Sequence, residues 1–278
     1  MEQLRERLKQ LPKQTKYIIC AVAVAVSILG IVLLLGKVPA QKPTPQTPQI
    51  TEPQPAPNPY GETDFQYDED GYLQCTAGES WRGIDVSHHQ SYIDWPKVAE
   101  SGVRFAMIRV GYRGIETAEL YMDDRAIENL QGALAAGIKV GVYFFSQAIT
   151  EEEAVEEAEY VLEIIKDYHI TMPVVFDWEW VRDDVRTADV GQDLLTKITA
   201  AFCARVERAG YTPMFYFNLS QGKDMLHLEK LTDYQFWLAM YRERMDYPYK
   251  LKMWQYTCEG AVPGIKGNVD IDLYFPDK

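Results

Sequence analysis

PVVFDWEW, residues 173–180, is a run of β-branched and aromatic residues that contains two carboxylates. An apolar run of this kind is typical of a strand buried on both faces, as in a parallel sheet covered by helices. Residues two apart in a strand point to the same face, so Asp177 and Glu179 should point together. The aromatic residues that alternate with them, up to Trp180, should then pack into the interior. The alternative, an exposed strand end with two solvated acids, fits poorly with so many aromatic neighbours.

Similar strand-like runs occur on both sides of this stretch. The eight predicted strands are 83–87, 103–110, 138–146, 173–180, 213–218, 236–241, 251–256 and 269–274. The predicted helices are 95–100, 123–136, 150–165 and 189–209, so that helices separate the early strands and few separate the late ones. This order predicts an α/β fold, an irregular β/α (TIM-like) barrel that is mostly parallel, over residues 81–278. An open doubly wound sheet is the alternative, but no Gly-rich phosphate loop follows a strand.

The first 80 residues divide into four segments by composition. Residues 1–17 are polar and basic, whereas residues 18–36 are uncharged and mostly apolar. The second segment has about the length of a helix that spans a bilayer. Residues 37–60 contain eight prolines and predict an extended spacer. Residues 61–80 are acidic and turn-rich, and predict a lead-in hairpin or loop.

The basic residues ahead of the apolar segment predict that the N-terminus lies in the cytoplasm. We therefore expect a transmembrane signal anchor in the cell membrane, single-pass, with the barrel outside the cell. The alternative is a signal peptide that is cleaved near Ala40, which would release the barrel as a secreted protein.

The net charge of the chain is −13, and the acidic residues are concentrated after residue 60. A domain this acidic has no electrostatic attraction for nucleic acid. We therefore expect no nucleic-acid partner, and we expect the barrel to be monomeric.

The chain has four histidines and four cysteines. They form no cluster at metal-ligand spacing, so we expect neither a metal ion nor a cofactor, and His88 and His89 should lie in the wall of the site. Cys203, within a predicted helix, should be a buried thiol. Cys75 and Cys258 fall in predicted loops and could form a disulfide outside the cell.

Functional side chains of an α/β barrel cluster at the carboxyl ends of its strands. Four carboxylates are predicted there: Asp85, Asp177, Glu179 and Asp270. The candidates for substrate binding at the same ends are Arg109, Tyr143, Tyr216, Asn218, Trp237, Tyr241 and Gln255. Paired carboxylates carry out glycoside hydrolysis, and aromatic rings form flat platforms for sugars. Crowding should also raise the pKa of one carboxyl group, which could then act as an acid.

Two of the candidates have a second interpretation. Arg109 could pair with a carboxylate of the site and orient it, or it could cap its strand. Trp237 could contact a sugar or pack inside the barrel. Asp272 lies two residues beyond Asp270 and should point the same way if the strand is regular.

Ordered motifs span the predicted barrel: GIDVSHHQ (83–90), KVGVYFFSQA (139–148), FDWE (176–179), WLAMY (237–241), WQYT (254–257) and VPGIKGNVDID (262–272). Together they resemble the lysozymes of glycoside hydrolase family 25, over about residues 81–276. The resemblance implies an irregular β/α barrel. It also implies a muramidase that cleaves the β-1,4 bond between N-acetylmuramic acid and N-acetylglucosamine in the glycan strands of peptidoglycan, the bacterial cell wall.

The resemblance further implies that Glu179 is the general acid and Asp177 its partner, with Asp85 and Asp270 as the other carboxylates. The substrate's acetamido group could attack the anomeric carbon while Asp177 stabilises the intermediate, or a carboxylate or a water could be the nucleophile. We expect acetamido assistance. Two other functions stay open: a catalytically inactive cell-wall-binding module, and a glycosidase acting on another N-acetylated polysaccharide.

Overall fold

The computed structural model describes residues 54–242 and 244–277. The predicted cytoplasmic segment, the predicted membrane segment at 18–36 and most of the Pro-rich spacer lie outside these residues. Among the residues described, none of the helices is both long enough and apolar enough to cross a bilayer.

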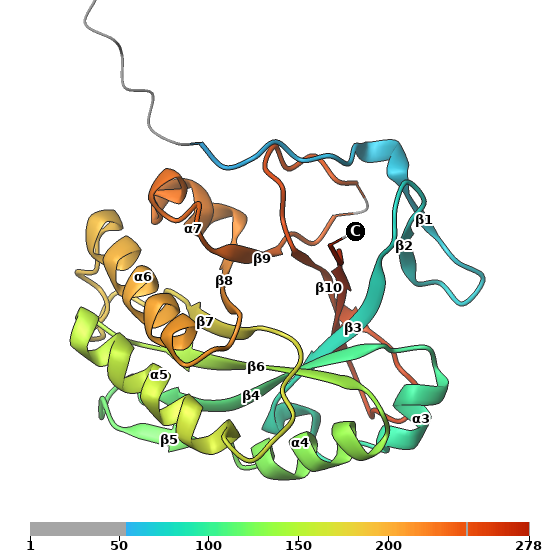
Figure 1. The fold of residues 1–278 in the computed structure, drawn as a ribbon, viewed down its shortest axis with the longest axis horizontal. Coiled ribbons are helices and arrows are strands. Elements are labelled where there is room, and N and C mark those ends of the chain that lie inside the picture. The colour runs from blue at the N-terminus through green and yellow to red at the C-terminus, as the bar shows by residue number, and fades with distance from the viewer. Residues whose placement is uncertain (1–53, 243, 278) are drawn as a thin grey trace, which may run out of the picture. The chain divides into compact units, whose positions relative to one another are not determined.

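Eight strands form a closed barrel (Figure 1). They are β3 (Trp81–Val86), β4 (Phe105–Arg113), β6 (Lys139–Ser146), β7 (Val174–Trp178), β8 (Pro213–Asn218), β9 (Gln235–Ala239), β10 (Met253–Gly260) and β11 (Val269–Tyr274). Their order is β3-β11-β10-β9-β8-β7-β6-β4, and pairing of β3 with β4 closes the ring. The predicted barrel is therefore confirmed against the open doubly wound sheet.

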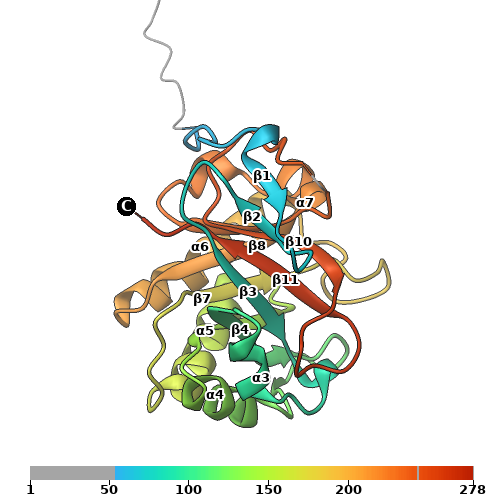
Figure 2. The same cartoon turned by 90° about the vertical axis from the view of Figure 1, so that its right-hand side faces the viewer.

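The direction of one strand sets the layout of the whole barrel. Strand β11 runs antiparallel to both of its neighbours, β10 and β3. The other neighbouring pairs of the ring are parallel. Figure 2 shows β11 between β10 and β3. The start of β11 consequently lies at the end of the barrel where the parallel strands finish.

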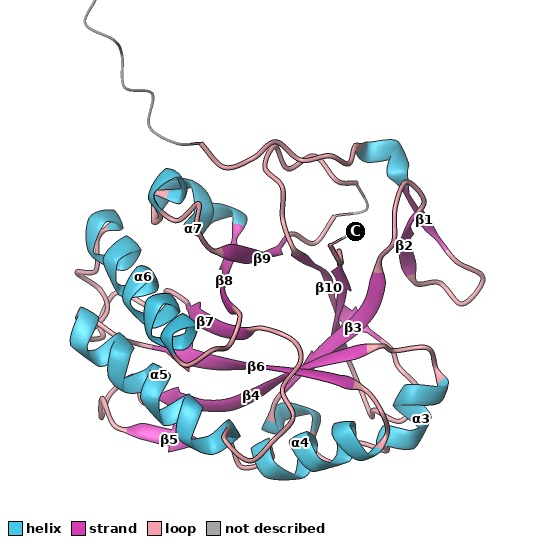
Figure 3. Ribbon diagram, in the orientation of Figure 1, coloured by secondary structure: helices cyan, strands magenta, loops and turns pink. Residues whose placement is uncertain are grey.

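Helices cover the outside of the early strands (Figure 3). They are α3 (Trp95–Glu100), α4 (Ala126–Ala135), α5 (Glu151–Ile165), α6 (Gln192–Arg208) and the short α7 (Leu219–Asp224), with 3-10 turns η1 (Glu62–Asp64), η2 (His88–Gln90) and η3 (Leu228–Lys230). Helix α5 begins where the sequence predicts it, because the Thr150 hydroxyl accepts a hydrogen bond from the Glu153 N–H at 3.1 Å. The Glu153 carboxylate in turn accepts the Ile149 N–H at 2.9 Å.

A hairpin covers part of the late strands instead of a helix. Strands β1 (Phe65–Tyr67) and β2 (Leu73–Cys75) are antiparallel. Phe65 packs edge-on against Trp254 of β10, with ring centroids 5.2 Å apart. The hydroxyl of Tyr256 on β10 accepts a hydrogen bond from the Leu73 N–H. The hairpin thus buries apolar surface of β10 that no long helix covers.

Inside the barrel, the side chains change from apolar to polar at one level. The apolar layer is Phe105, Met107, Met172, Val175, Met214, Trp237 and Met253. Two residues further towards the carboxyl end, on the same face of each strand, Met107 is followed by Arg109 and Val175 by Asp177. Met253 is likewise followed by Gln255. The apolar layer therefore forms a floor beneath a polar mouth.

Trp180 corrects the prediction that the aromatic residues around the two acids all pack inside. Strand β7 ends at Trp178, which is buried, whereas Trp180 lies in the following loop and is 50% exposed. The strand period no longer applies beyond the last paired residue, so the predicted inward orientation of Trp180 is wrong.

The cysteines in the described part of the chain are all free. Cys203 is fully buried on α6, as predicted. Cys75 lies on β2 and the exposed Cys258 on β10, and the disulfide that could join them is not formed.

Gly83 of β3 allows Phe105 to fill the floor of the barrel. A Cβ atom at Gly83 would lie 2.2 Å from the Phe105 ring. We predict that Gly83→Ala lowers the free energy of unfolding by about 1–3 kcal/mol, because the ring would be forced from its site. Urea unfolding followed by tryptophan fluorescence measures this change. Gly61→Ala is the control, since its new methyl group would meet only Asp64 at 3.9 Å; equal stability of the two variants would contradict the prediction.

Candidate active site

A cavity of about 260 Å³ opens at the carboxyl ends of the parallel strands. All four predicted carboxylates and all but one of the other predicted residues line it: Asp85, Asp177, Glu179, Asp270, Arg109, Tyr143, Tyr216, Trp237, Tyr241 and Gln255. Ser87, His89, Gln90 and Phe145 complete the lining. All eight barrel strands, or the loops after them, contribute the predicted side chains, so only closure of the barrel brings them together.

Asp270 reaches the mouth for a different reason from the other acids. It lies near the start of β11, and β11 runs opposite to the parallel strands. In the antiparallel register Asp270 pairs with Asp85 of β3. Carboxylates from two neighbouring strands are therefore placed side by side.

Asp177 and Glu179 share the mouth in the way that their spacing predicts. Asp177 is buried, and its Oδ1 atom has no hydrogen-bond partner among the residues described. Burial, and then the neighbouring Glu179, raise the pKa of Asp177 well above its usual range, while Arg109 opposes this shift. Burial, and then the charge of Asp270, raise the pKa of Glu179. The two carboxyl groups therefore hold on to protons at higher pH than solvated acids do.

The backbone beneath Glu179 is held firmly by side chains. The Gln147 Nε2 group donates to the Glu179 carbonyl oxygen at 3.0 Å. The Trp178 indole N–H donates to the Ala148 carbonyl oxygen at 3.0 Å. Gln221 of α7 donates to the Trp178 carbonyl oxygen. These contacts fix the chain that carries Glu179 although it lies beyond the last residue of β7.

Gln255 connects three residues of the cavity. Its Nε2 group donates to Asp85 Oδ2 at 2.7 Å. Its Oε1 atom accepts from the hydroxyls of Tyr216, at 3.1 Å, and Tyr241, at 2.8 Å. Because its amide is committed to these bonds and is only 4% exposed, Gln255 positions its neighbours. Burial, and then Asp270 and Asp272, still raise the pKa of Asp85 well above its usual range.

Asp272 is a buried acid beneath the cavity that the sequence placed with less certainty than Asp270. It is 0% exposed and accepts a hydrogen bond from the Trp237 indole N–H at 2.8 Å. Its Oδ2 atom has no partner within the described part of the chain. Burial, and then Asp270, raise the pKa of Asp272 well above its usual range. Trp237, 1% exposed, lines the cavity and also packs inside the barrel.

Arg109 pairs with an acid that the sequence did not single out. Its Nε and Nη2 groups lie 2.9 and 2.8 Å from Asp123 Oδ2. Burial disfavours ionisation of Asp123, but hydrogen bonds from Arg125 and His88, with the charge of Arg109, lower its pKa below the usual value. Asp123 is the first residue of the predicted helix 123–136, and nothing in its local sequence placed it at the site. Only the fold brings it to Arg109.

Asn218 is the predicted residue that the fold does not bring to the cavity. Its side chain accepts the Gln221 N–H at 3.1 Å and caps α7. The sequence predicted no helix here, which is why Asn218 looked available for a ligand. Of the two histidines, His89 lines the cavity and His88 does not. The His88 ring is tilted against that of His89, with ring centroids 4.1 Å apart. Among residues 54–242 and 244–277, no group of His, Cys, Asp and Glu is arranged to hold a metal ion.

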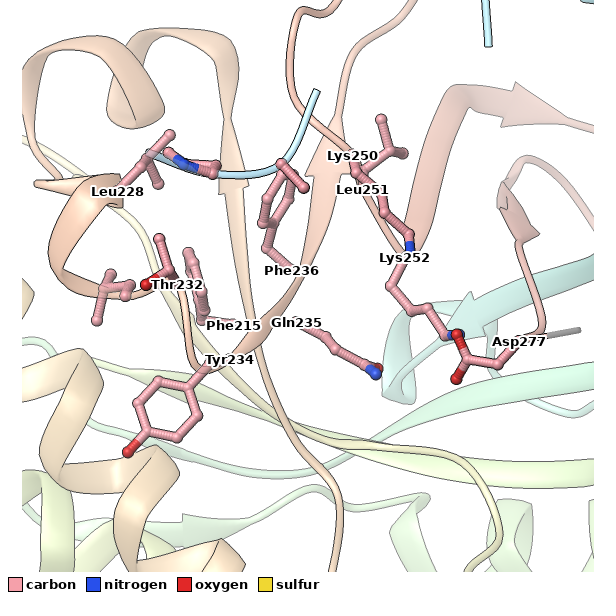
Figure 4. A pocket seen from close by; sticks show the side chains of 13 residues that line it. Phe215, Leu228, Thr232, Tyr234, Gln235, Phe236, Lys250, Leu251, Lys252 and Asp277 are labelled. Carbon is pink, nitrogen blue, oxygen red and sulfur yellow. The ribbon is translucent and has the colours of Figure 1, made fainter. Parts of the chain in front are cut away.

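A second hollow, of about 170 Å³, lies near the starts of β9 and β10 and the end of β11, and Figure 4 shows its lining side chains. Its wall is mainly apolar and includes Phe215, Leu228 and Phe236. Its charged residues are the ion pair Lys252 and Asp277, 2.7 Å apart, and Lys250. None of the predicted site residues line it. The carboxylate-lined cavity is therefore the candidate active site.

The chain was compared with known proteins. The sequence model of the family described as "Glycosyl hydrolases family 25" matches residues 84–265. The uncharacterized protein YegX of Escherichia coli is 27% identical over 214 residues, which cover 73% of this chain and 72% of YegX. The autolytic lysozyme of Clostridium acetobutylicum is 26% identical over 198 residues, 69% of this chain and 55% of that enzyme.

Among solved structures, the modular autolysin LytC from Streptococcus pneumoniae, in complex with a synthetic peptidoglycan ligand, is similar with a TM-score of 0.64 and 27% identity. The match covers 76% of this chain and 50% of LytC, so this chain spans about half the length of that protein.

The raised pKa of Asp270 gives a prediction for stability. Burial raises it from 3.8 to about 6. The folded state therefore holds this proton more tightly than the unfolded state does, so the stabilisation is complete below the usual pKa and is lost as pH rises through about 6. The free energy of unfolding of the unchanged protein should therefore fall between about pH 4 and 7. In Asp270→Asn this fall should be smaller by roughly 1–3 kcal/mol. Urea unfolding across this range measures it, with the exposed Asp124→Asn as control; an unchanged pH dependence in Asp270→Asn would refute the prediction.

Proposed function

Since this chain belongs to family 25 of the glycosyl hydrolases, and is therefore a glycoside hydrolase, we propose that it is a lysozyme. It would cleave the β-1,4 bond between N-acetylmuramic acid and N-acetylglucosamine in the glycan strands of peptidoglycan. The observation that carries this proposal is the meeting of four carboxylates from three separate strands and one strand-end loop in a single cavity. The name of the clostridial relative and the peptidoglycan ligand of LytC support the choice of substrate.

Glu179 suits the role of general acid. Its pKa is raised, because it is buried and because Asp270 repels the ionised form, so it can carry a proton at a pH where solvated glutamates have lost theirs. Donation of this proton to the glycosidic oxygen would allow the sugar leaving group to depart as an alcohol. Its fixed backbone holds the carboxyl group at the mouth.

Asp177 suits the role of partner to the substrate's acetamido group. The Asp177 Oδ1 atom is buried without a partner in the described structure and belongs to a residue that lines the cavity. It could accept the acetamido N–H, which would orient the acetamido oxygen towards the anomeric carbon. Burial and the charge of Glu179 raise the pKa of Asp177, and Arg109 opposes this shift. When Glu179 carries the proton, its repulsion of Asp177 is removed, and an ionised Asp177 would stabilise the cationic intermediate.

We predict that Glu179→Gln lowers turnover of purified peptidoglycan by about 100- to 10,000-fold, because an amide cannot donate the proton. Binding to cell walls should persist. The release of new reducing ends measures turnover, and wall pelleting measures binding. Glu152→Gln, an exposed change on α5, is the matched control.

The same assay separates the other functions. Wall binding by the unmodified protein without new reducing ends would identify a binding module. Cleavage that leaves a sugar other than N-acetylmuramic acid at the new reducing end, seen by mass analysis, would identify a glycosidase of another N-acetylated polysaccharide. Substantial activity of Glu179→Gln would remove Glu179 as the acid.

We also propose that residues 18–36 anchor the enzyme in the cell membrane, with residues 37–60 as a spacer that lets the barrel reach the wall. The support is the uncharged length of the first segment and the proline content of the second. An acidic enzyme gains no affinity for an anionic wall by charge, so a tether would supply local concentration.

The anchor gives its own prediction. In a bacterial host, the full chain should sediment with membranes and stay there after an alkaline carbonate wash, because a spanning helix is not released by changes in charge. Immunoblotting of the fractions measures this. A protein found in the medium with a new N-terminus near Ala40 would show a cleaved signal peptide instead.

A further inference from the structure

Another pocket, distinct from the hollow in Figure 4, adjoins the carboxylate-lined cavity. It has a volume of about 450 Å³ and shares His89, Arg109 and Phe145 with the cavity, so the two hollows are adjacent. Tyr112 of β4 and Tyr121 of β5 (Leu120–Met122) form part of its wall, stacked with ring centroids 5.3 Å apart. We call this hollow the side pocket. A branch of a molecule bound at the carboxylates would meet the side pocket next to the cavity.

Arg109 stands where the two hollows join, in a fixed orientation. Asp123 holds its Nε and Nη2 groups. Asp123 is itself buried, and the backbone N–H groups of His88 and Arg125 donate to it at 3.2 and 2.9 Å. The Nη1 group of Arg109 donates no hydrogen bond to any residue that the structure describes. A held guanidinium with a free donor edge suits an acceptor oxygen on a ligand.

The charges around the side pocket favour an acceptor-rich ligand. Its carboxylate is Glu116, which is paired with Arg182. Arg113 is likewise neutralised, by Glu156 and Glu157. Arg109 is itself paired with Asp123, so what remains at the junction is the Nη1 donor edge of Arg109 and not an unpaired charge.

We propose that the side pocket binds the stem peptide carried by N-acetylmuramic acid, and that Arg109 Nη1 donates to the carbonyl oxygen of the lactyl group linking the peptide to the sugar. This inference rests on the proposed function. Muramic acid differs from N-acetylglucosamine by this branch, which must leave the cavity sideways from the sugar ring. The side pocket adjoins the cavity, with the hydrogen-bond donor Arg109 between the two hollows and aromatic rings in its wall.

The test uses soluble muramyl oligosaccharides in two forms, with stem peptides and with the peptides removed by an amidase. Tyr112→Ala removes wall from the side pocket. It should lower kcat/KM for the peptide-bearing form by about 10-fold, an ordinary value for the loss of apolar contact in a pocket. It should change kcat/KM for the stripped form by less than about 2-fold. Tyr112→Phe keeps the ring and should keep the preference, and Tyr67→Ala on the distant hairpin should change neither value.

Arg109→Gln should lower kcat/KM for both forms, since both carry a lactyl oxygen. A binding measurement free of turnover accompanies the kinetics: N-acetylmuramyl dipeptide should bind about 10-fold more weakly to Tyr112→Ala than to the unchanged protein in calorimetric titration. An equal loss by Tyr112→Ala on both oligosaccharides, with unchanged dipeptide affinity, would overturn the proposal. If the unchanged protein cleaves neither oligosaccharide, the proposed function fails, whereas dipeptide binding still decides whether the side pocket takes the peptide.

Discussion

The desolvation of several carboxylates at one end of the barrel is the constraint on which the rest of the structure depends. Asp85, Asp177 and Asp272 are buried, and Asp270 pairs with Asp85 in the sheet register. Burial and mutual repulsion raise their pKa values, so the folded chain holds protons that a solvated chain would release. Burial of these carboxylates costs folding stability. The same burial keeps a carboxyl group protonated, which cleavage of a glycoside requires.

The remainder of the barrel keeps these groups in place. Gln255 ties Asp85 to two tyrosine hydroxyls, and the Trp237 indole holds Asp272. Below them lies an apolar floor of buried side chains, packed around Phe105. A rigid floor matters because a catalytic carboxyl group displaced by about 1 Å loses much of its effect. The apolar floor and the carboxylate-lined cavity are therefore successive layers of the same strands.

Much of the fold could be predicted from local patterns. Apolar β-branched runs marked the eight strands, and helical spacing with the Thr150 cap marked α5. The two-residue period placed Asp177 and Glu179 on one side. It failed at Trp180, because β7 ends first and the period of a strand has no meaning in a loop. The local sequence patterns also did not predict α7, a helix of six residues whose cap is Asn218.

By itself, then, the sequence determined the order of the strands and the acids that face the mouth, because both depend on residues close together in the chain. Tertiary structure decided which groups meet. The reversal of β11 places Asp270 beside Asp85, and closure of the barrel places Asp123 against Arg109 and Gln255 against Asp85. Such contacts depend on register and strand direction between distant segments, and local spacing carries no information about either.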